Sequence, residues 1–367
     1  MTSLRFAQPQ SDFRQELTRR VDAYFADGRS RHADARTWAV GLGALALAMG
    51  GWALLVFGAL PAWLGALLSV ATGFFIAQVG FNLGHDAIHG ALSKERWVNG
   101  LAARSFDLLG ASSRMWAWAH NGVHHTFTNV PGADHDLEPA GLLHLYRKPN
   151  APALVRFQHL YAWPLYGLTM LSWVFLKDFV QLATRRETTR ADVVDVVLGK
   201  ALHVGVWLVL PLLLGPWAWW QVLIGYALAM MAAGFTAAVV FQLAHVVEGP
   251  QMPRPDAVGV LADDFFVHQL RTTSNFAPRS ALATALTGGL NHQVEHHLFP
   301  RICHTHYPAL SAVVEACARE FGVPYHVKAT FFSALASHAR VLRAVGGTED
   351  LGDLGGAEAR GQRQEGF

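Results

Sequence analysis

The sequence predicts an all-α integral membrane protein in which four transmembrane helices form two hairpins. Only 15% of its 367 residues are charged, whereas a soluble domain carries about 25%. The missing charge is concentrated, because no Asp, Glu, Lys or Arg occurs between Arg36 and Asp86 or between Lys200 and Glu248. Each stretch can hold two helices of about 20 residues, the length that crosses a bilayer. Buried helix pairs in a soluble protein are the alternative, but two such pairs are hard to bury in one chain.

The first elements follow from the first uncharged stretch. Residues 1–36 are polar and basic, and they predict a cytoplasmic segment with a short amphipathic helix that lies on the membrane surface. Residues 37–58 and 62–84 form the first pair of spans, and the Gly- and Pro-containing segment between them supplies a tight turn. This pair is the first predicted hairpin.

The later elements repeat this layout. Residues 198–214 and 221–244 form the second pair of spans, joined by a tryptophan-rich turn of the kind found at a membrane interface. The apolar stretch 161–176 contains proline and glycine and is followed at once by charged residues, which favours an interfacial or re-entrant helix over a full span. The membrane domain is expected over 37–340, and the polar, glycine-rich tail 341–367 is expected to be disordered.

The distribution of Lys and Arg predicts the orientation. These residues occur in the N-terminal segment and in the two long polar segments, and the two short turns carry none. By the positive-inside rule, both hairpins enter the membrane from the cytoplasm and return to it. Both termini and a helical cap then lie in the cytoplasm of a multi-pass protein, for which we expect the bacterial inner membrane. The net charge of +2 gives no reason to expect a nucleic-acid partner.

Eight histidines occur in four groups, each at the end of an apolar run or in the polar segment that follows it. On a helix, residues four apart share a face, and an adjacent residue lies about 100° round, where it can reach a second metal. Imidazole is the commonest transition-metal ligand in proteins, and eight are more than one ion can use. The cap is therefore expected to hold a histidine-ligated di-metal site. The groups are His85 and His89; His120, His124 and His125; His245; and His296 and His297.

The residue types narrow the choice of metal without fixing it. Hard Mg²⁺ and Ca²⁺ are disfavoured because imidazoles dominate, whereas iron, copper and zinc all accept imidazole. A membrane metal transporter is an alternative function of another class. Transporters place polar ligands along a path within the membrane, but here the spans are nearly free of polar residues and the histidines gather on one side.

The histidine groups lie in stretches that resemble the motifs of the integral-membrane fatty-acid desaturases. The resemblance covers roughly residues 37–325 and is closest to bacterial linoleoyl-CoA and front-end acyl desaturases. It implies an O₂-dependent enzyme that introduces a cis double bond into an acyl chain. It also implies two Fe²⁺ ions held by the eight histidines, and two electrons from an external carrier such as ferredoxin or a cytochrome. The matching stretches are 84–89, 120–129, 241–248, 269–276 and 288–300.

Two further points follow from the resemblance. Gln293 corresponds to the residue that opens the last histidine motif in these enzymes, so it is a candidate ninth ligand; His292, which repeats the spacing of His120, is the alternative. The acyl group could be carried by CoA, an acyl-carrier protein or a membrane lipid. A di-iron hydroxylase, ketolase or acetylenase acting on a lipid is the alternative activity.

Polar and aromatic residues near the motifs suggest supporting roles. A ligating histidine usually donates its other ring N–H to a carboxylate or carbonyl, although each candidate could equally cap a helix or meet water. Two tryptophans of the polar segment are expected to line a narrow apolar channel for the substrate. The candidates for holding the imidazoles are Asp86, Asn121, Asp134, Glu248 and Glu295, and those for the channel are Trp116 and Trp118.

Overall fold

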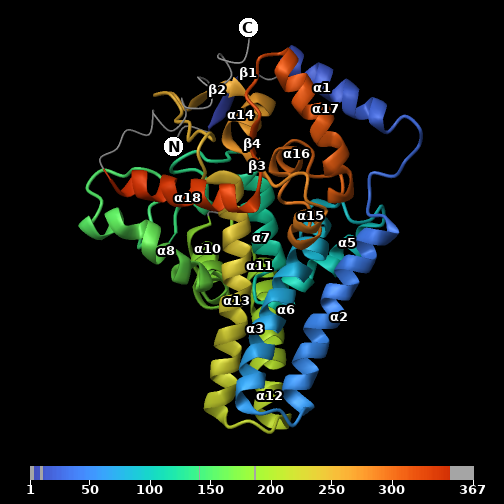
Figure 1. The fold of residues 1–367 in the computed structure, drawn as a ribbon, viewed down its shortest axis with the longest axis vertical. Coiled ribbons are helices and arrows are strands. Elements are labelled where there is room, and N and C mark those ends of the chain that lie inside the picture. The colour runs from blue at the N-terminus through green and yellow to red at the C-terminus, as the bar shows by residue number, and fades with distance from the viewer. Residues whose placement is uncertain (1–3, 9–10, 140, 186, 348–367) are drawn as a thin grey trace.

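The computed structural model is mostly helical and has an elongated shape (Figure 1). It describes residues 4–8, 11–139, 141–185 and 187–347. Four of its helical stretches are long and apolar enough to cross a bilayer, and they match the four predicted spans. They are Ala35–Phe57, Ala62–His89, Arg190–Leu214 and Trp219–His245. We call these four stretches the stalk, and we call the described residues of 4–34, 90–189 and 246–347 the cap.

The first two stalk helices form from the first uncharged run. Helix α2 (Ala35–Phe57) begins where the Asp34 side chain accepts the backbone N–H of Thr37 at 2.8 Å, a typical N-cap. Residues 58–61 join α2 to α3 (Ala62–Val79), which runs directly into the π-helical turn η1 (Gly80–His85) and the short helix α4 (Asp86–His89). The second stretch therefore carries two histidines of the predicted site at the end of the stalk that meets the cap.

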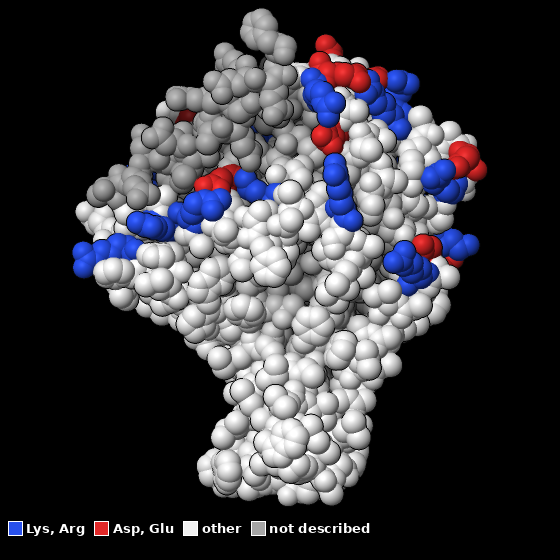
Figure 2. Space-filling view, in the orientation of Figure 1, with Lys and Arg blue, Asp and Glu red and all other residues white. Residues whose placement is uncertain are grey.

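The other two stalk stretches include the second uncharged run. Helix α11 (Arg190–Val204) continues through the π-helical turn η6 (Gly205–Val209) into α12 (Leu210–Leu214), and α13 is Trp219–His245. Within the stalk, α3 packs most extensively against α13 and α2. On the face seen in Figure 2, the narrow lower part of the stalk carries no Lys, Arg, Asp or Glu, whereas the wide upper part of the molecule carries many. This distribution suits a stalk surrounded by lipid.

The cap gathers at one end of the stalk (Figure 1). It also contains four short strands, which the all-α prediction missed because strands of three to five residues show no clear period. Strand β1 (Arg5–Gln8) pairs in parallel with β2 (Val260–Asp264), and β3 (Ser274–Phe276) pairs in parallel with β4 (His326–Lys328). Its helices are α1 (Asp12–Tyr24), α5 (Arg96–Ala103), α6 (Ser105–Leu109), α7 (Ser113–Ala117), η2 (Trp118–His124), η3 (His135–Leu137), η4 (Ala153–Phe157), α8 (Gln158–Gly167), α9 (Thr169–Ser172), η5 (Trp173–Lys177), α10 (Asp178–Thr184), α14 (Phe265–Thr272), α15 (Ala281–Thr287), α16 (Gln293–Leu298), η7 (His304–His306), α17 (Tyr307–Glu320) and α18 (Phe331–Gly346).

The N-terminal helix is amphipathic, and its apolar face packs against protein; its predicted position on the membrane surface stays a prediction. In α1 the apolar residues Phe13, Leu17 and Val21 are buried in a core cluster shared with α17. Figure 1 places α1 at the end of the cap that lies away from the stalk. An amphipathic pattern specifies one buried face but does not say whether protein or lipid covers it.

The structure also changes the predicted boundaries of two other segments. The apolar stretch 161–176 is divided among α8, α9 and η5, beside the upper end of the stalk (Figure 1). It exposes large apolar side chains there, including Leu168 and Phe175, which suits an interfacial position. Residues 341–346, expected in a disordered tail, form the end of α18 because Leu342 and Val345 are buried in the core. Residues 348–367 lie outside the described residues.

Candidate metal centre

All eight predicted histidines lie in one buried cluster, where the cap meets the stalk. Their side chains come from four separate segments: η1 and α4, η2 with the residue after it, the last residue of α13, and α16. Each of the eight is at most 9% exposed. Segments up to about 200 residues apart in the sequence therefore meet at one place, as the spacing of the motifs predicted.

The cluster has two lobes and a bridge between them. Within each group below, one ligand atom from every residue lies within 4.8 Å of the others. The first lobe consists of His85, His89, His120 and His296, and the second consists of His124, His245 and His297. The bridge is the group of His125 with His296 and His297. The cluster therefore offers two separate groups of potential ligands, joined by a third.

A π-helical turn sets the geometry of the central motif. In η2 the backbone N–H of His125 donates to the carbonyl oxygen of His120 at 2.9 Å, a step of five residues instead of four. The Nε2 atoms of these two rings are 3.1 Å apart. The sequence interpretation assumed an α-helix, which would direct His125 away from His120. Single π-helical turns occur often at functional sites, and here one adds a ring to the cluster.

The chemistry of the cluster fits a bound metal. Buried polar atoms nearly always have hydrogen-bond partners, yet ring nitrogens of five cluster histidines have none among the described residues. Nε2 of His120 also lies 3.3 Å from Nε2 of His85 and 3.1 Å from Nε2 of His125, so three potential ligand atoms converge there. The unpartnered atoms are Nε2 of His89, His296 and His297 and Nδ1 of His125 and His245.

Among the cluster histidines that the cap contributes, lowered pKa values keep most of the rings neutral. Burial lowers the pKa of His120, His125, His296 and His297, and repulsion between neighbouring rings lowers it further. Neutral imidazole is the form that binds metals. His124 differs: burial lowers its pKa, but the Asp134 and Asp136 carboxylates outweigh this and raise it above the usual value.

Three polar side chains hold cluster histidines by their Nδ1 atoms. Asp134 lies 3.0 Å from Nδ1 of His124, as the sequence predicted. Gln269 accepts from Nδ1 of His297 at 2.8 Å through its Oε1. Gln269 also donates to the backbone carbonyl of His125 at 2.9 Å, so it links two motifs. The Tyr307 hydroxyl lies 3.2 Å from Nδ1 of His296. Such partners fix the ring orientation and leave Nε2 for a metal.

Sequence reasoning did not single out Gln269 or Tyr307. Gln269 lies in one of the stretches that resemble desaturase motifs, and this position is the feature of the sequence that could have identified it. Tyr307 begins α17 and is 1% exposed, although tyrosine usually reaches the surface. Nothing in its sequence context distinguishes it from an ordinary core residue.

The other candidates for holding the imidazoles have different partners. The Asp86 carboxylate accepts from Sγ of Cys303 at 3.0 Å and Nδ1 of His304 at 2.8 Å, so it ties α4 to the segment after α16. The side chains of the remaining three candidates bond to other residues. Asn121 donates to the carbonyl oxygen of Ile88, and Glu248 pairs with Arg340. Glu295 accepts from Asn275 and Tyr325. Burial raises the pKa of Glu295 to about 7.

The two candidates for a ninth ligand point in different directions. The Gln293 side chain lies in the cluster, with its Nε2 at 2.9 Å from Nε2 of His245. The His292 ring is held by the Ser311 hydroxyl at 2.8 Å and lies 3.4 Å from the Thr284 hydroxyl. The geometry therefore favours Gln293 as the residue that faces a metal.

A narrow apolar cavity of about 20 Å³ touches the first lobe. Trp116 lines it and stacks on the His120 ring, with centroids 4.0 Å apart. Trp118, the other predicted channel residue, is not part of this lining; its ring contacts the Arg185 guanidinium and His135. We call this cavity the slot. Its lining includes His85, Phe106, Trp116, Met170, Ala237 and Phe241.

Replacing Asp134 with Asn is expected to weaken the metal centre about ten- to hundredfold, the usual cost of losing a partner of a ligating histidine. The amide cannot supply the negative charge that balances His124. Metal content and desaturation measured on the same preparation test this. Asp263→Asn is the matched control, because the Asp263 carboxylate pairs with Arg271 at 2.8 Å and belongs to no group of potential ligands among the described residues. Equal losses in both variants would contradict the assignment.

The chain is similar to known proteins over most of its length. The model of the family "Fatty acid desaturase" matches residues 61–329. A sn-1 linoleoyl-lipid 6-desaturase from Arthrospira platensis is 35% identical over 90% of this chain and 92% of its own length. A protein of the same description from Synechocystis is 35% identical over 94% of this chain and 98% of its own. An acyl-lipid (8-3)-desaturase from Physcomitrium patens is 36% identical over 76% of this chain and 59% of its own.

Proposed function

The chain belongs to the fatty acid desaturase family, which confirms the resemblance seen in the sequence, and from this premise we propose how its site works. The protein is a membrane oxidoreductase that desaturates fatty-acyl chains with O₂. We propose that two Fe²⁺ ions, one in each lobe, are its cofactor. The observation that carries this proposal is the buried cluster of eight histidines with five unpartnered ring nitrogens.

The proposed ligands follow from the lobes. His85, His89, His120 and His296 would hold one ion, and His124, His245 and His297 the other, with His125 between them and Gln293 beside His245. Bound iron supplies the O₂-dependent chemistry that breaks unactivated C–H bonds, which no side chain can do. The chain's own contribution is to orient the rings through Asp134, Gln269 and Tyr307.

The slot supports a positioning role toward the substrate. Its walls are apolar and reach His85, and it is narrow. The slot has room for about one small group, so the methylenes of an acyl chain that reach it would be held beside the first lobe while water is kept out. Holding a reacting group in this way lowers the barrier substantially. Trp116 serves both purposes, because it lines the slot and supports the ring of His120.

We propose a lipid-linked acyl chain as the substrate, with the new cis double bond at carbon 6. The support is the description of two relatives that match over at least 90% of both chains as sn-1 linoleoyl-lipid 6-desaturases. The remaining features follow the sequence interpretation. Both pairs of stalk helices would be hairpins that enter from the cytoplasm of the bacterial inner membrane. The cap would face the cytoplasm and receive two electrons from a carrier such as ferredoxin or a cytochrome.

Expression in a bacterial host with a simple lipid profile, supplied with linoleate, tests this proposal. Mass spectrometry that locates double bonds is expected to find a new one at carbon 6 in intact membrane lipids, with no oxygen added to the chain. A hydroxylated product would contradict desaturation. A new double bond that appears in acyl-CoA before it appears in lipid would contradict the proposed substrate.

A further inference from the structure

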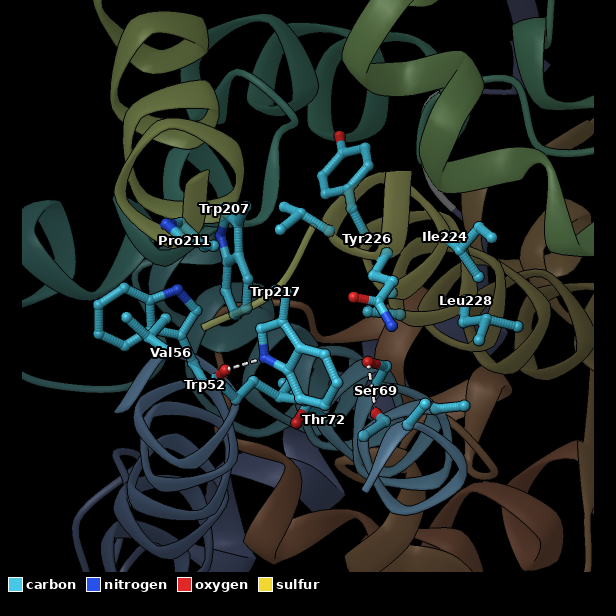
Figure 3. A pocket seen from close by; sticks show the side chains of 18 of the residues that line it. Trp52, Val56, Ser69, Thr72, Trp207, Pro211, Trp217, Ile224, Tyr226 and Leu228 are labelled. Atoms are coloured by element: carbon cyan, nitrogen blue, oxygen red, sulfur yellow. Dashed lines mark hydrogen bonds between the residues drawn. The ribbon is translucent and has the colours of Figure 1, made fainter. Parts of the chain in front are cut away.

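A cavity other than the slot lies inside the stalk, away from the histidines. It measures about 170 Å³ and is bordered by all four stalk stretches (Figure 3). On α3 it extends from Ala62 to Thr72, which is about 15 Å of helix. In Figure 3, Trp52 and Trp207 lie on one side, Trp217 stands in the middle, and Ile224 and Leu228 lie on the other side. The cavity therefore occupies the half of the stalk that lies furthest from the cap.

Close helix crossings separate this cavity from the slot. A Cβ atom on Gly73 would lie 2.0 Å from the carbonyl oxygen of Ala229, and one on Gly51 would lie 2.4 Å from the Thr72 hydroxyl. Ile76 and Met230 are fully buried on the cap side of these crossings. A chain that enters the slot from the histidines does not pass this point, so any occupant of the cavity comes from elsewhere.

The interior of the cavity is apolar. The indole N–H groups of Trp52, Trp207 and Trp217 donate to backbone carbonyl oxygens at 2.9, 2.7 and 2.6 Å, so their ring faces remain for contact with a ligand. The Ser69 hydroxyl donates to the carbonyl oxygen of Gly65 at 2.8 Å. The Thr72 hydroxyl, which has no partner among the described residues, packs into the crossing with Gly51.

The size and surroundings of the cavity point to a hydrocarbon. Apolar cavities of about 150 Å³ stay dry and bind apolar molecules. No charged residue occurs between Arg36 and Asp86 or between Lys200 and Glu248, so nothing here would hold a charged headgroup. Trp220 and Ile224 line the cavity and are 50% and 52% exposed, so it opens toward whatever surrounds the stalk.

We propose that this cavity binds one acyl chain of a bilayer lipid, from the leaflet opposite the cap. The site goes beyond the proposed reaction and does not depend on it. The bound chain fills a void that would otherwise weaken packing between α12 and the helices around it. The headgroup stays outside, near the residues that join the stalk helices, and the site therefore selects for an apolar chain rather than for a particular headgroup.

Photolabelling of the full-length protein tests this site. The probe is phosphatidylglycerol with a diazirine at the end of one acyl chain, in vesicles of phosphatidylglycerol and phosphatidylethanolamine. After irradiation, mass spectrometry is expected to find adducts on cavity residues such as Trp217 and Ser69, besides those on exposed stalk residues such as Phe57. Adducts confined to the exposed surface would overturn the proposal.

Two variants that fill the cavity sharpen the test. Ala66→Phe on α3 and Gly225→Leu on α13 enlarge side chains that line the cavity. Each is expected to reduce the cavity adducts several-fold while the Phe57 adducts stay constant. Ala71→Phe, on the exposed face of the same helix as Ala66, is the matched control and should leave the wild-type pattern. The metal content of each variant shows whether it has folded. A variant with a filled cavity that keeps its metal decides the test. Undiminished cavity adducts in that variant would overturn the proposal.

Discussion

Replacing His297 with Ala is expected to abolish desaturation and to remove a large part of the bound metal. His297 belongs both to the second lobe and to the bridge, so its loss affects more than one group of ligands. Loss of an outer partner of a ligating histidine alone costs about ten- to hundredfold, and loss of the ligand itself should exceed about a hundredfold. Product analysis and metal content on the same membranes measure both effects.

His159→Ala is the matched control for this variant. His159 lies in α8, outside the cluster, and is partly buried. Its backbone carbonyl accepts from the Trp163 indole at 3.0 Å, and that bond survives the substitution. Activity and metal content are expected to stay near wild-type values. A His297→Ala enzyme that kept its metal and its activity would show that the cluster is only a structural core.

Filling the slot is expected to separate metal binding from catalysis. Ala237 is 5% exposed and lines the slot on α13. In Ala237→Phe the new ring takes the space proposed for the acyl chain, while the histidines keep their positions. A displacement of about 1 Å can cost about a hundredfold in rate, so desaturation should fall by at least that much. The metal content should remain unchanged.

Ala227→Phe provides the comparison, because Ala227 is partly buried on the same helix but borders neither cavity. Its desaturation is expected to stay close to that of the wild type. Overpacking costs about 1–3 kcal/mol of stability, so thermal unfolding is measured on both variants. If Ala237→Phe desaturates lipids as fast as Ala227→Phe, the slot does not hold the substrate.

The features predicted most accurately from the sequence depend on local composition. All four stalk stretches could be located from the uncharged runs on either side of Pro61 and of the tryptophan-rich turn. Length and apolarity together determine whether a helix can span a bilayer. The paired histidines predicted a common site because few other roles require such spacing. Neither inference needed any knowledge of tertiary packing.

The features that escaped prediction depend on contacts between distant segments. The π-helical turn that pairs His120 with His125 has no sequence signal distinct from an α-helix. Asp86 stands between two predicted ligands, yet its carboxylate points to Cys303 and His304, more than 200 residues away in sequence. Gln269 acquires its role only because α14 packs against α16. Such partners are set by folding, and a single sequence does not reveal them.

The central claim is that imidazoles from four segments hold a pair of iron ions. Iron K-edge X-ray absorption on the purified protein, combined with elemental analysis, tests it most directly. The account predicts two irons per chain, first coordination shells dominated by imidazole nitrogen, and scattering from a second iron nearby. A preparation that desaturates lipids while it carries no iron, or iron bound mainly by sulfur, would contradict it.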